Sequence, residues 1–124
     1  MVIKSAELCW LVVADLKKSV EFYTKTLGLT LLNMTEEFGW AELQGKEGGT
    51  MIGLCQACEE QPVLPGGNAV MTFTVNDMDQ ASADLQSRGL LPMGPVIEVP
   101  GHVKMRDFVD LDKNRFQLVQ QLDI

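Results

Sequence analysis

The feature of this sequence that most constrains its fold is an internal repeat. The segment that begins Val13-Ala14-Asp15-Leu16 and ends Leu27-Gly28-Leu29 is echoed by one that begins Val75-Asn76-Asp77-Met78 and ends Arg88-Gly89-Leu90. The two aspartates lie 62 residues apart (77 − 15) and the two glycines 61 (89 − 28), so the copies stay nearly in register over half of the chain. Such a repeat predicts one small structural module present twice, with a site between the two copies.

Each copy carries signals for one helix. Asp15 and Asp77 are good N-cap residues, because a short carboxylate can accept hydrogen bonds from the first free backbone N–H groups of a helix. Gly28 and Gly89 suit the left-handed residue that ends a helix. Between these limits the inward-facing residues recur at helical spacing: Leu16, Val20, Tyr23 and Leu27 in the first copy, and Met78, Ala81, Ser82 and Leu85 in the second.

Strand patterns surround both helices and give each half the order βαβββ. The expected strands span residues 3–13, 29–36, 38–44 and 50–56 in the first half, and 68–75, 90–99, 103–109 and 115–122 in the second. The sequence predicts a single α+β domain, with module one at 1–57, a linker at 58–67 and module two at 68–124. We expect the tandem βαβββ modules to form a curved, barrel-like mixed sheet with the helices on the outside.

Alternation along the strands divides their residues between a helix-facing row and a concave row. We expect the first strand to be buried on both sides, because both of its faces are apolar. The helix-facing row comprises Cys9, Leu11, Val13, Ile52, Leu54, Met71, Phe73, Val75, Phe116 and Leu118. The concave row comprises Leu8, Trp10, Met51, Gly53, Cys55, Val70, Thr72, Thr74, Arg115 and Gln117, and Trp40 and Glu42 join it.

Charge and composition exclude several functions. A net charge of −7 with 10 Lys and Arg disfavours nucleic acid as a partner. No apolar run is long enough for a membrane span, and the N-terminus lacks the pattern of a signal peptide, so we expect a cytoplasmic protein. The three cysteines are expected to be reduced thiols. A zinc site that joins Cys55 and Cys58 to Cys9 and His102 is a weaker alternative.

Taken in order, these features resemble the vicinal oxygen chelate superfamily, which contains glyoxalases, bleomycin-binding resistance proteins, fosfomycin resistance enzymes and extradiol dioxygenases. The resemblance covers nearly the whole chain. The residues that carry it are the two βαβββ halves, Val13-Ala14-Asp15-Leu16 with Ser19, Phe22 and Tyr23, the stop Leu27-Gly28-Leu29, and the late segment Asp110-Leu111-Asp112-Lys113-Asn114-Arg115-Phe116-Gln117-Leu118.

Metal-dependent members of that superfamily hold a divalent ion with His, Glu or Gln side chains from four strands. In this sequence the equivalent positions fall on Leu8, Gly53, Val70 and Gln117. Three of these residues have no donor atom, and one neutral amide cannot hold a catalytic divalent ion. A register shift by one residue would bring Glu7, Cys9 or Cys55 nearby, but it would also turn the helix-facing apolar row outward. The resemblance therefore implies a member without the metal and without another cofactor.

The bleomycin-binding members are metal-free dimers that hold their ligand in grooves between subunits. The resemblance thus implies a homodimer that binds a small organic molecule, with drug sequestration as the concrete function. The acidic balance favours a cationic ligand, and Trp10 and Trp40 could stack on a planar or cationic one. The expected ligand-binding residues are Leu8, Trp10, Trp40, Glu42, Met51, Cys55, Val70, Thr72, His102, Arg115 and Gln117.

Two other functions stay open at this stage. A glyoxalase-like lyase or dioxygenase would use an unrecognised ligand set, or His102 or Glu42 as a general base without metal, although no neighbouring group at a diagnostic spacing orients either one. An interaction module would instead fill its concave surface with its own side chains. Plain structural roles also stay open: either tryptophan as core, Arg115 and His102 as solvated surface, and Gln117 as a partner for backbone.

Overall fold

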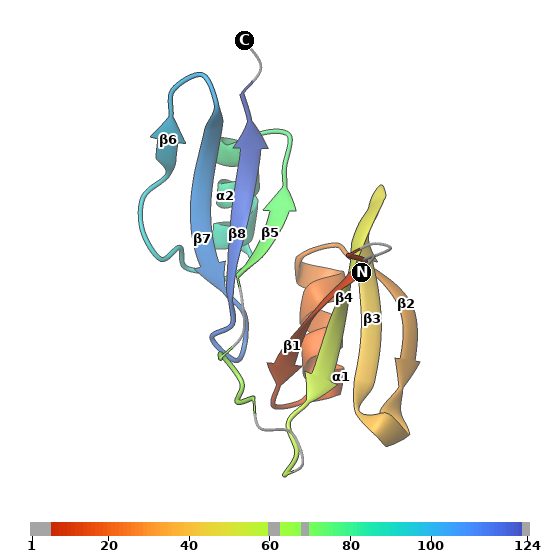
Figure 1. The fold of residues 1–124 in the computed structure, drawn as a ribbon. Coiled ribbons are helices and arrows are strands. Elements are labelled where there is room, and N and C mark those ends of the chain that lie inside the picture. Colours follow the sequence, from red (N-terminus) through yellow and green to blue (C-terminus); the bar gives the residue numbers. More distant parts are fainter. Residues whose placement is uncertain (1–5, 60–62, 68–69, 123–124) are drawn as a thin grey trace. The chain divides into compact units, whose positions relative to one another are not determined.

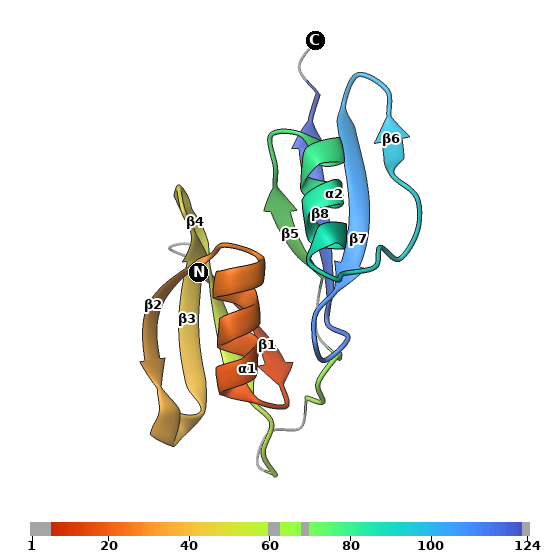
Figure 2. The same ribbon diagram turned by 180° about the vertical axis from the view of Figure 1, so that it is seen from behind.

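The computed structural model describes residues 6–59, 63–67 and 70–122 of the chain. Its internal contacts divide the chain into two compact units, Met1–Asn68 and Ala69–Ile124. Each unit has the predicted βαβββ order, with one α-helix packed against one face of a four-stranded sheet (Figures 1 and 2). Among the described residues, no helix is long and apolar enough to cross a membrane.

The first unit contains β1 (Leu8–Val13), α1 (Leu16–Glu21), β2 (Thr30–Thr35), β3 (Trp40–Gly45) and β4 (Gly48–Gln56). Its strands lie in the order β1-β4-β3-β2, with β1 parallel to β4 and the other pairs antiparallel. A π-helical turn, η1 (Phe22–Thr26), extends α1, and a 3₁₀ turn, η2 (Glu36–Phe38), joins β2 to β3. The sequence predicted one continuous helix here, because a widened turn keeps the same apolar residues inward and leaves no separate pattern.

Two side chains fix the start of α1. The carboxylate of Asp15 accepts a hydrogen bond from the Lys18 N–H (3.0 Å), as predicted for an N-cap. Oε1 of Gln56, at the end of β4, accepts one from the Leu16 N–H (3.0 Å). After η1 the chain reverses at Gly28, whose φ of 78° confirms the predicted left-handed stop. The helix is thereby attached to the strand on which it packs.

The core of the first unit lies between α1 and the sheet. Its buried side chains come from the helix and η1, from the expected helix-facing row and from β3: Leu11, Val13, Leu16, Val20, Tyr23, Ala41, Leu43, Ile52 and Leu54. The prediction that the first strand is buried on both sides is wrong for its first half, where Leu8, Cys9 and Trp10 are exposed. These residues lie on an edge strand that pairs only with β4 in its own sheet. The predicted strand start falls in residues 3–5, outside the described residues.

The second unit contains β5 (Met71–Thr74), α2 (Met78–Ser87), β6 (Ile97–Val99), β7 (Val103–Val109) and β8 (Arg115–Gln121), in the sheet order β5-β8-β7-β6. The strand predicted at 90–99 is limited to β6, because Pro92 and Pro95 have no N–H to give to a ladder. The strand predicted at 68–75 is shorter than expected, and its residues 68–69 lie outside the described residues.

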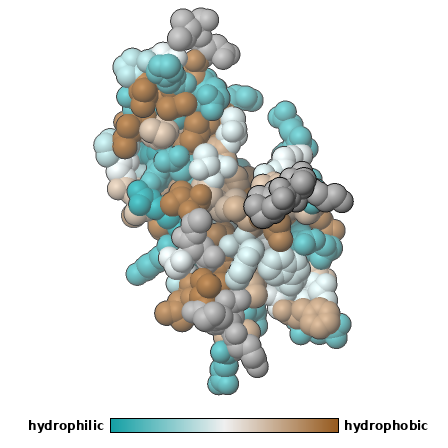
Figure 3. Space-filling view, viewed as in Figure 1, coloured by the Kyte–Doolittle hydropathy of each residue, from teal (hydrophilic) through white to brown (hydrophobic). Residues whose placement is uncertain are grey.

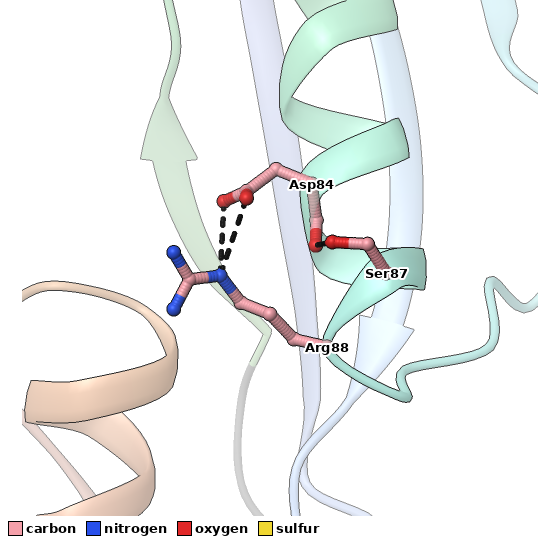
Figure 4. A network of polar contacts seen from close by, with 3 residues as sticks. All are labelled: Asp84, Ser87 and Arg88. Atoms are coloured by element: carbon pink, nitrogen blue, oxygen red, sulfur yellow. Dashed lines mark hydrogen bonds and ion pairs between the residues drawn. The ribbon is translucent and has the colours of Figure 1, made fainter.

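The start of α2 repeats the arrangement at α1. Asp77 accepts a hydrogen bond from the Gln80 N–H (3.0 Å), and Oε1 of Gln120 accepts one from the Met78 N–H (2.7 Å). At the other end, Arg88 and Ser87 both bond to Asp84: the Arg88 Nε–H lies 3.2 Å from each carboxylate oxygen, and the Ser87 hydroxyl donates to the Asp84 carbonyl (Figure 4). This pair is exposed, so it adds only a few tenths of a kcal/mol to the helix.

Aromatic packing and one buried turn hold the second sheet together. Phe116 contacts Phe73 and Phe108, with ring centroids 5.8 and 5.9 Å away. In the turn between β7 and β8, the buried Asp110 accepts hydrogen bonds from the N–H groups of Asp112 and Asn114 and from the Asn114 side chain. The predicted α+β fold is confirmed: the described strands form two mixed four-stranded sheets and no closed barrel.

Candidate ligand-binding site

The sheet of the first unit has an open face, the face turned away from α1. Pairing across the sheet sets Trp10 opposite Gly53, Gly53 opposite Glu42, and Glu42 opposite Asn33. Because Ala41, Leu43, Ile52 and Leu54 point into the core, their neighbours in sequence point to the open face. Trp40 and Glu42 therefore share this face with Trp10. On the side of the molecule seen in Figure 3, hydrophobic and hydrophilic residues are interspersed.

The two tryptophans meet over Gly53. Their ring centroids are 6.4 Å apart and their planes are inclined by 59°. A Cβ atom added at Gly53 would lie 2.6 Å from Cζ2 of Trp40 and closer still to Cη2, so the Trp40 indole extends from β3 across β4. Trp10 is 36% exposed and Trp40 is half-buried. The pair thus presents aromatic surface at the outside of the first unit.

One acidic group lies next to this pair. Glu42 is on β3, two residues along from Trp40, and its Oε1 accepts a hydrogen bond from Nδ2 of Asn33 on β2 (2.5 Å). The bond holds the half-buried carboxylate on the open face, and Asn33 was not among the predicted residues. A fixed negative charge beside exposed aromatic rings favours a cationic or partly positive ligand.

A surface hollow of about 530 Å³ lies at one end of the first sheet. Of the predicted residues only Met51 lines it, although Leu8 pairs with Met51 across β1 and β4. The remaining lining residues are Ala6, Glu7, Gln44, Gly49 and Thr50. No sequence pattern predicted these residues, because they come from the ends of strands, where the alternating pattern stops.

On the open face of the second sheet, Asp107 is the centre of a polar cluster. This carboxylate accepts hydrogen bonds from Gln117 Nε2 (2.9 Å) and Arg115 Nε (2.7 Å), and Thr72 pairs with Gln117 on the other side. The Asp107 side chain is 17% exposed, whereas that of Arg115 is 53% exposed. Since the Arg115 guanidinium is already paired, the second face has no net positive charge at this point. Asp107 was missed, although it occupies the position in β7 that Glu42 occupies in β3.

The remaining predicted residues are His102, Val70 and Cys55. His102 is exposed in the β6–β7 turn, at the opposite end of β7 from Asp107. Its backbone N–H donates to the Val99 carbonyl (2.9 Å). Val70 is exposed just before β5. Cys55 is half-buried opposite Trp40. Cys9, Cys55 and Cys58 form no disulfide with one another in the described part of the chain.

The residues predicted at the superfamily's metal positions do not have the donor set for a divalent ion. Leu8, Gly53 and Val70 have no donor atom, and the amide of Gln117 is bonded to Asp107. The space above Gly53, into which a ligating side chain would project, is taken by the Trp40 indole. No group of three His, Cys, Asp or Glu residues in the described part of the chain could hold a metal ion.

Comparison with known proteins identifies the family. The model of the Glyoxalase/Bleomycin resistance protein/Dioxygenase superfamily matches residues 5–118, so this chain belongs to that superfamily. Among curated proteins, none matches the sequence significantly.

Solved structures of the same fold include an antibiotic-binding protein. TnmS3, an antibiotic binding protein from Streptomyces sp. CB03234, has 28% identity and a TM-score of 0.81, with 98% of each chain covered. A glyoxalase/bleomycin resistance protein from the same organism has 28% identity and a TM-score of 0.75, covering 92% of this chain and 98% of its own. A superfamily member from Sphaerobacter thermophilus DSM 20745 has a TM-score of 0.81 and 23% identity, with coverage of 96% and 98%, and supports the fold alone.

Proposed function

We propose that this protein is a metal-independent binder of small organic molecules that sequesters a planar aromatic compound, preferably a cation, against Trp10 and Trp40. The observation that carries the proposal is the meeting of the two indoles over Gly53, on an open sheet face that also holds the Glu42 carboxylate. A cation above an indole ring gains roughly 0.5 to 2 kcal/mol, and the net charge of −7 adds long-range attraction.

The antibiotic-binding activity of TnmS3 supports this class of function, since that protein has the same fold and 28% identity. In the proposal, Leu8, Met51 and Cys55 complete the apolar surroundings in the first unit. The ligand contacts proposed within the second unit are Val70, Thr72, His102, Arg115 and Gln117, together with Asp107. A cytoplasmic homodimer, as in the bleomycin-binding members, is the proposed form of the protein.

An enzyme of the glyoxalase or dioxygenase type is less well supported. Three of the four residues at the predicted metal positions lack donors, and Glu42, the candidate base in the first unit, is held by Asn33. A metal-dependent member needs several protein ligands at one place. The donor chemistry therefore favours binding over metal-assisted catalysis.

A titration tests the binding proposal. The probe is 9-aminoacridine, a planar aromatic cation, and its fluorescence anisotropy is followed as protein is added. We expect saturable one-to-one binding, weaker binding of neutral acridone, and the weakest binding of anionic acridine-9-carboxylate. Trp40→Ala should reduce the 9-aminoacridine affinity about tenfold or more, since a tenfold loss is about 1.4 kcal/mol. Equal affinity for the anion would contradict the role of Glu42.

The matched control is Phe38→Ala, which removes an aromatic ring that is 76% exposed in the first unit but lies in η2, outside the strands of the open face. This variant should bind like the original protein. Thermal unfolding of both variants separates binding from folding. If Trp40→Ala weakens the fold as much as it weakens binding, Trp40 is a core residue and the proposed platform is wrong.

Metal independence has its own test. Purified protein is incubated with nickel, zinc, manganese or iron, passed through a desalting column and analysed for bound metal. We expect no stoichiometric metal and no effect of a chelator on 9-aminoacridine binding. Tight one-to-one retention of any of these ions would overturn this part of the proposal.

A further inference from the structure

Gly53 has an unusual environment for a strand residue. It lies in β4, between Trp10 on β1 and Glu42 on β3. A Cβ atom at this position would collide with the Trp40 ring and would also lie 3.0 Å from the Trp10 Cβ, which is tighter than most real Cβ contacts. The backbone does not explain the glycine, because its φ lies outside the left-handed region that other residues avoid. Glycine fits this position because it leaves room for the Trp40 ring, which a side chain would displace.

The second unit supports this explanation. Gln117 occupies in β8 the position that Gly53 occupies in β4, opposite Asp107 and next to the parallel strand β5. A long side chain fits there, so the fold itself does not require glycine at this place. The difference between the two positions is the tryptophan pair, which only the first unit has.

We propose that Gly53 is the positioning residue of the aromatic platform. By having no side chain, it lets the Trp40 indole reach across β4 toward Trp10, so that aromatic surface occupies the place where a side chain would otherwise project. The size of residue 53 thereby determines how well the open face binds flat aromatic rings: tightly with glycine, and more weakly with a larger residue. The ligand part of this inference rests on the proposed function, whereas the placement of Trp40 does not.

Gly53→Ala tests the placement without any ligand. Trp10 and Trp40 are the two tryptophans of the chain, so the near-ultraviolet circular dichroism and the tryptophan emission report on this pair. We expect Gly53→Ala to change the near-ultraviolet spectrum and to shift the emission to longer wavelength, because the displaced indole enters solvent. The control is Gly94→Ala, since a Cβ there meets nothing within 4 Å. Spectra of Gly53→Ala that match those of the original protein would overturn the proposal.

A double variant separates positioning from simple damage to the fold. Gly53→Ala should lower the melting temperature by roughly 5 °C in the original chain. In the Trp40→Ala background the same change should cost less than half as much, because only the contact with the Trp10 Cβ remains. An equal loss in both backgrounds would show that residue 53 acts through the backbone and not through Trp40. This comparison holds even if the single variant is poorly folded.

Binding of 9-aminoacridine completes the test. If the original protein binds the probe, Gly53→Ala should weaken binding about tenfold, as Trp40→Ala does. Unchanged binding despite changed spectra would refute the claim that residue 53 determines how well the open face of the first sheet binds flat aromatic rings. If the original protein binds none of the three acridines while Gly53→Ala changes the tryptophan spectra, the proposed function fails and the placement of Trp40 by Gly53 stands.

Discussion

The two units have the same secondary structure, but their open sheet faces differ. At three equivalent places the first unit has Trp10, Gly53 and Glu42, and the second has Thr72, Gln117 and Asp107. One face is aromatic around a glycine. On the other, a carboxylate binds an amide and a guanidinium. The difference concerns only the side chains that point away from the helices.

The helix sides, in contrast, are built alike. In both units an aspartate caps the helix, a glutamine from the last strand binds the first helical N–H, and a left-handed glycine follows the helix. The comparison teaches that the duplicated part of this molecule is the packing of a helix on a sheet. The open faces are free to differ because they do not contribute to that packing, and this is where we place the function.

A second difference lies in the turns that join the last two strands. In the first unit β3 and β4 are joined by an exposed glycine turn, where the Gln44 side chain donates to the Gly49 carbonyl (2.6 Å). In the second unit the corresponding turn contains Asp110 and Asn114, both buried and bonded to each other. We expect the second unit to depend much more on its turn than the first.

The largest effect should follow from Asp110→Ala. It leaves the N–H groups of Asp112 and Asn114 and the Asn114 amide without their acceptor, which should lower the free energy of unfolding by about 3 kcal/mol. Urea unfolding followed by far-ultraviolet circular dichroism measures this loss. The control, Gln44→Ala, removes one exposed hydrogen bond of the first unit and should cost about 0.5 kcal/mol. Similar losses from the two variants would abolish the contrast between the turns.

Much of the fold could be predicted from the sequence. The caps at Asp15 and Asp77, the stops at Gly28 and Gly89, and the alternation along β3, β4 and β8 are local signals, and two copies of them reinforced each other. The alternating pattern also placed Trp40 and Glu42 on the face of Trp10. Local chemistry determines these features, so no knowledge of distant contacts was needed.

The rest depends on pairings between distant residues. Gln56 and Gln120 accept hydrogen bonds from helix starts that lie 40 and 42 residues earlier in the chain. A single glutamine near the end of a strand forms no sequence pattern that predicts such a bond. Asp107 became recognisable only when β7 was paired with β8. From the sequence, Gly53 was recognised only as a position without a metal donor. That it leaves room for an indole could be recognised only from the direction of the Trp40 side chain in the structure.

The intermediate effect concerns the glutamines, where the two units should behave alike. Gln56→Ala and Gln120→Ala each remove the acceptor for a helical N–H group, which should cost about 1 to 2 kcal/mol of unfolding free energy. Urea unfolding at pH 7 measures both. Gln121→Ala, which changes an exposed neighbour in β8, serves as the control and should cost less than about 0.5 kcal/mol. A cost confined to one of the two glutamines would show that the helix attachments are not equivalent.

The smallest effect separates the two carboxylates on the open faces. Asp107→Ala removes a mostly buried acceptor from Gln117 and Arg115, and it should lower the free energy of unfolding by about 1 kcal/mol. The loss is small because Arg115 is half exposed, so water can solvate its guanidinium in the variant. Glu42→Ala should cost less than about 0.5 kcal/mol, since its one bond to Asn33 is exposed. In 9-aminoacridine binding the order should reverse, because Glu42 lies on the same sheet face as the two tryptophans: Glu42→Ala weakens binding severalfold. If Glu42→Ala leaves binding unchanged and Asp107→Ala weakens it, the ligand is held by the second unit, and the aromatic face of the first is not the site.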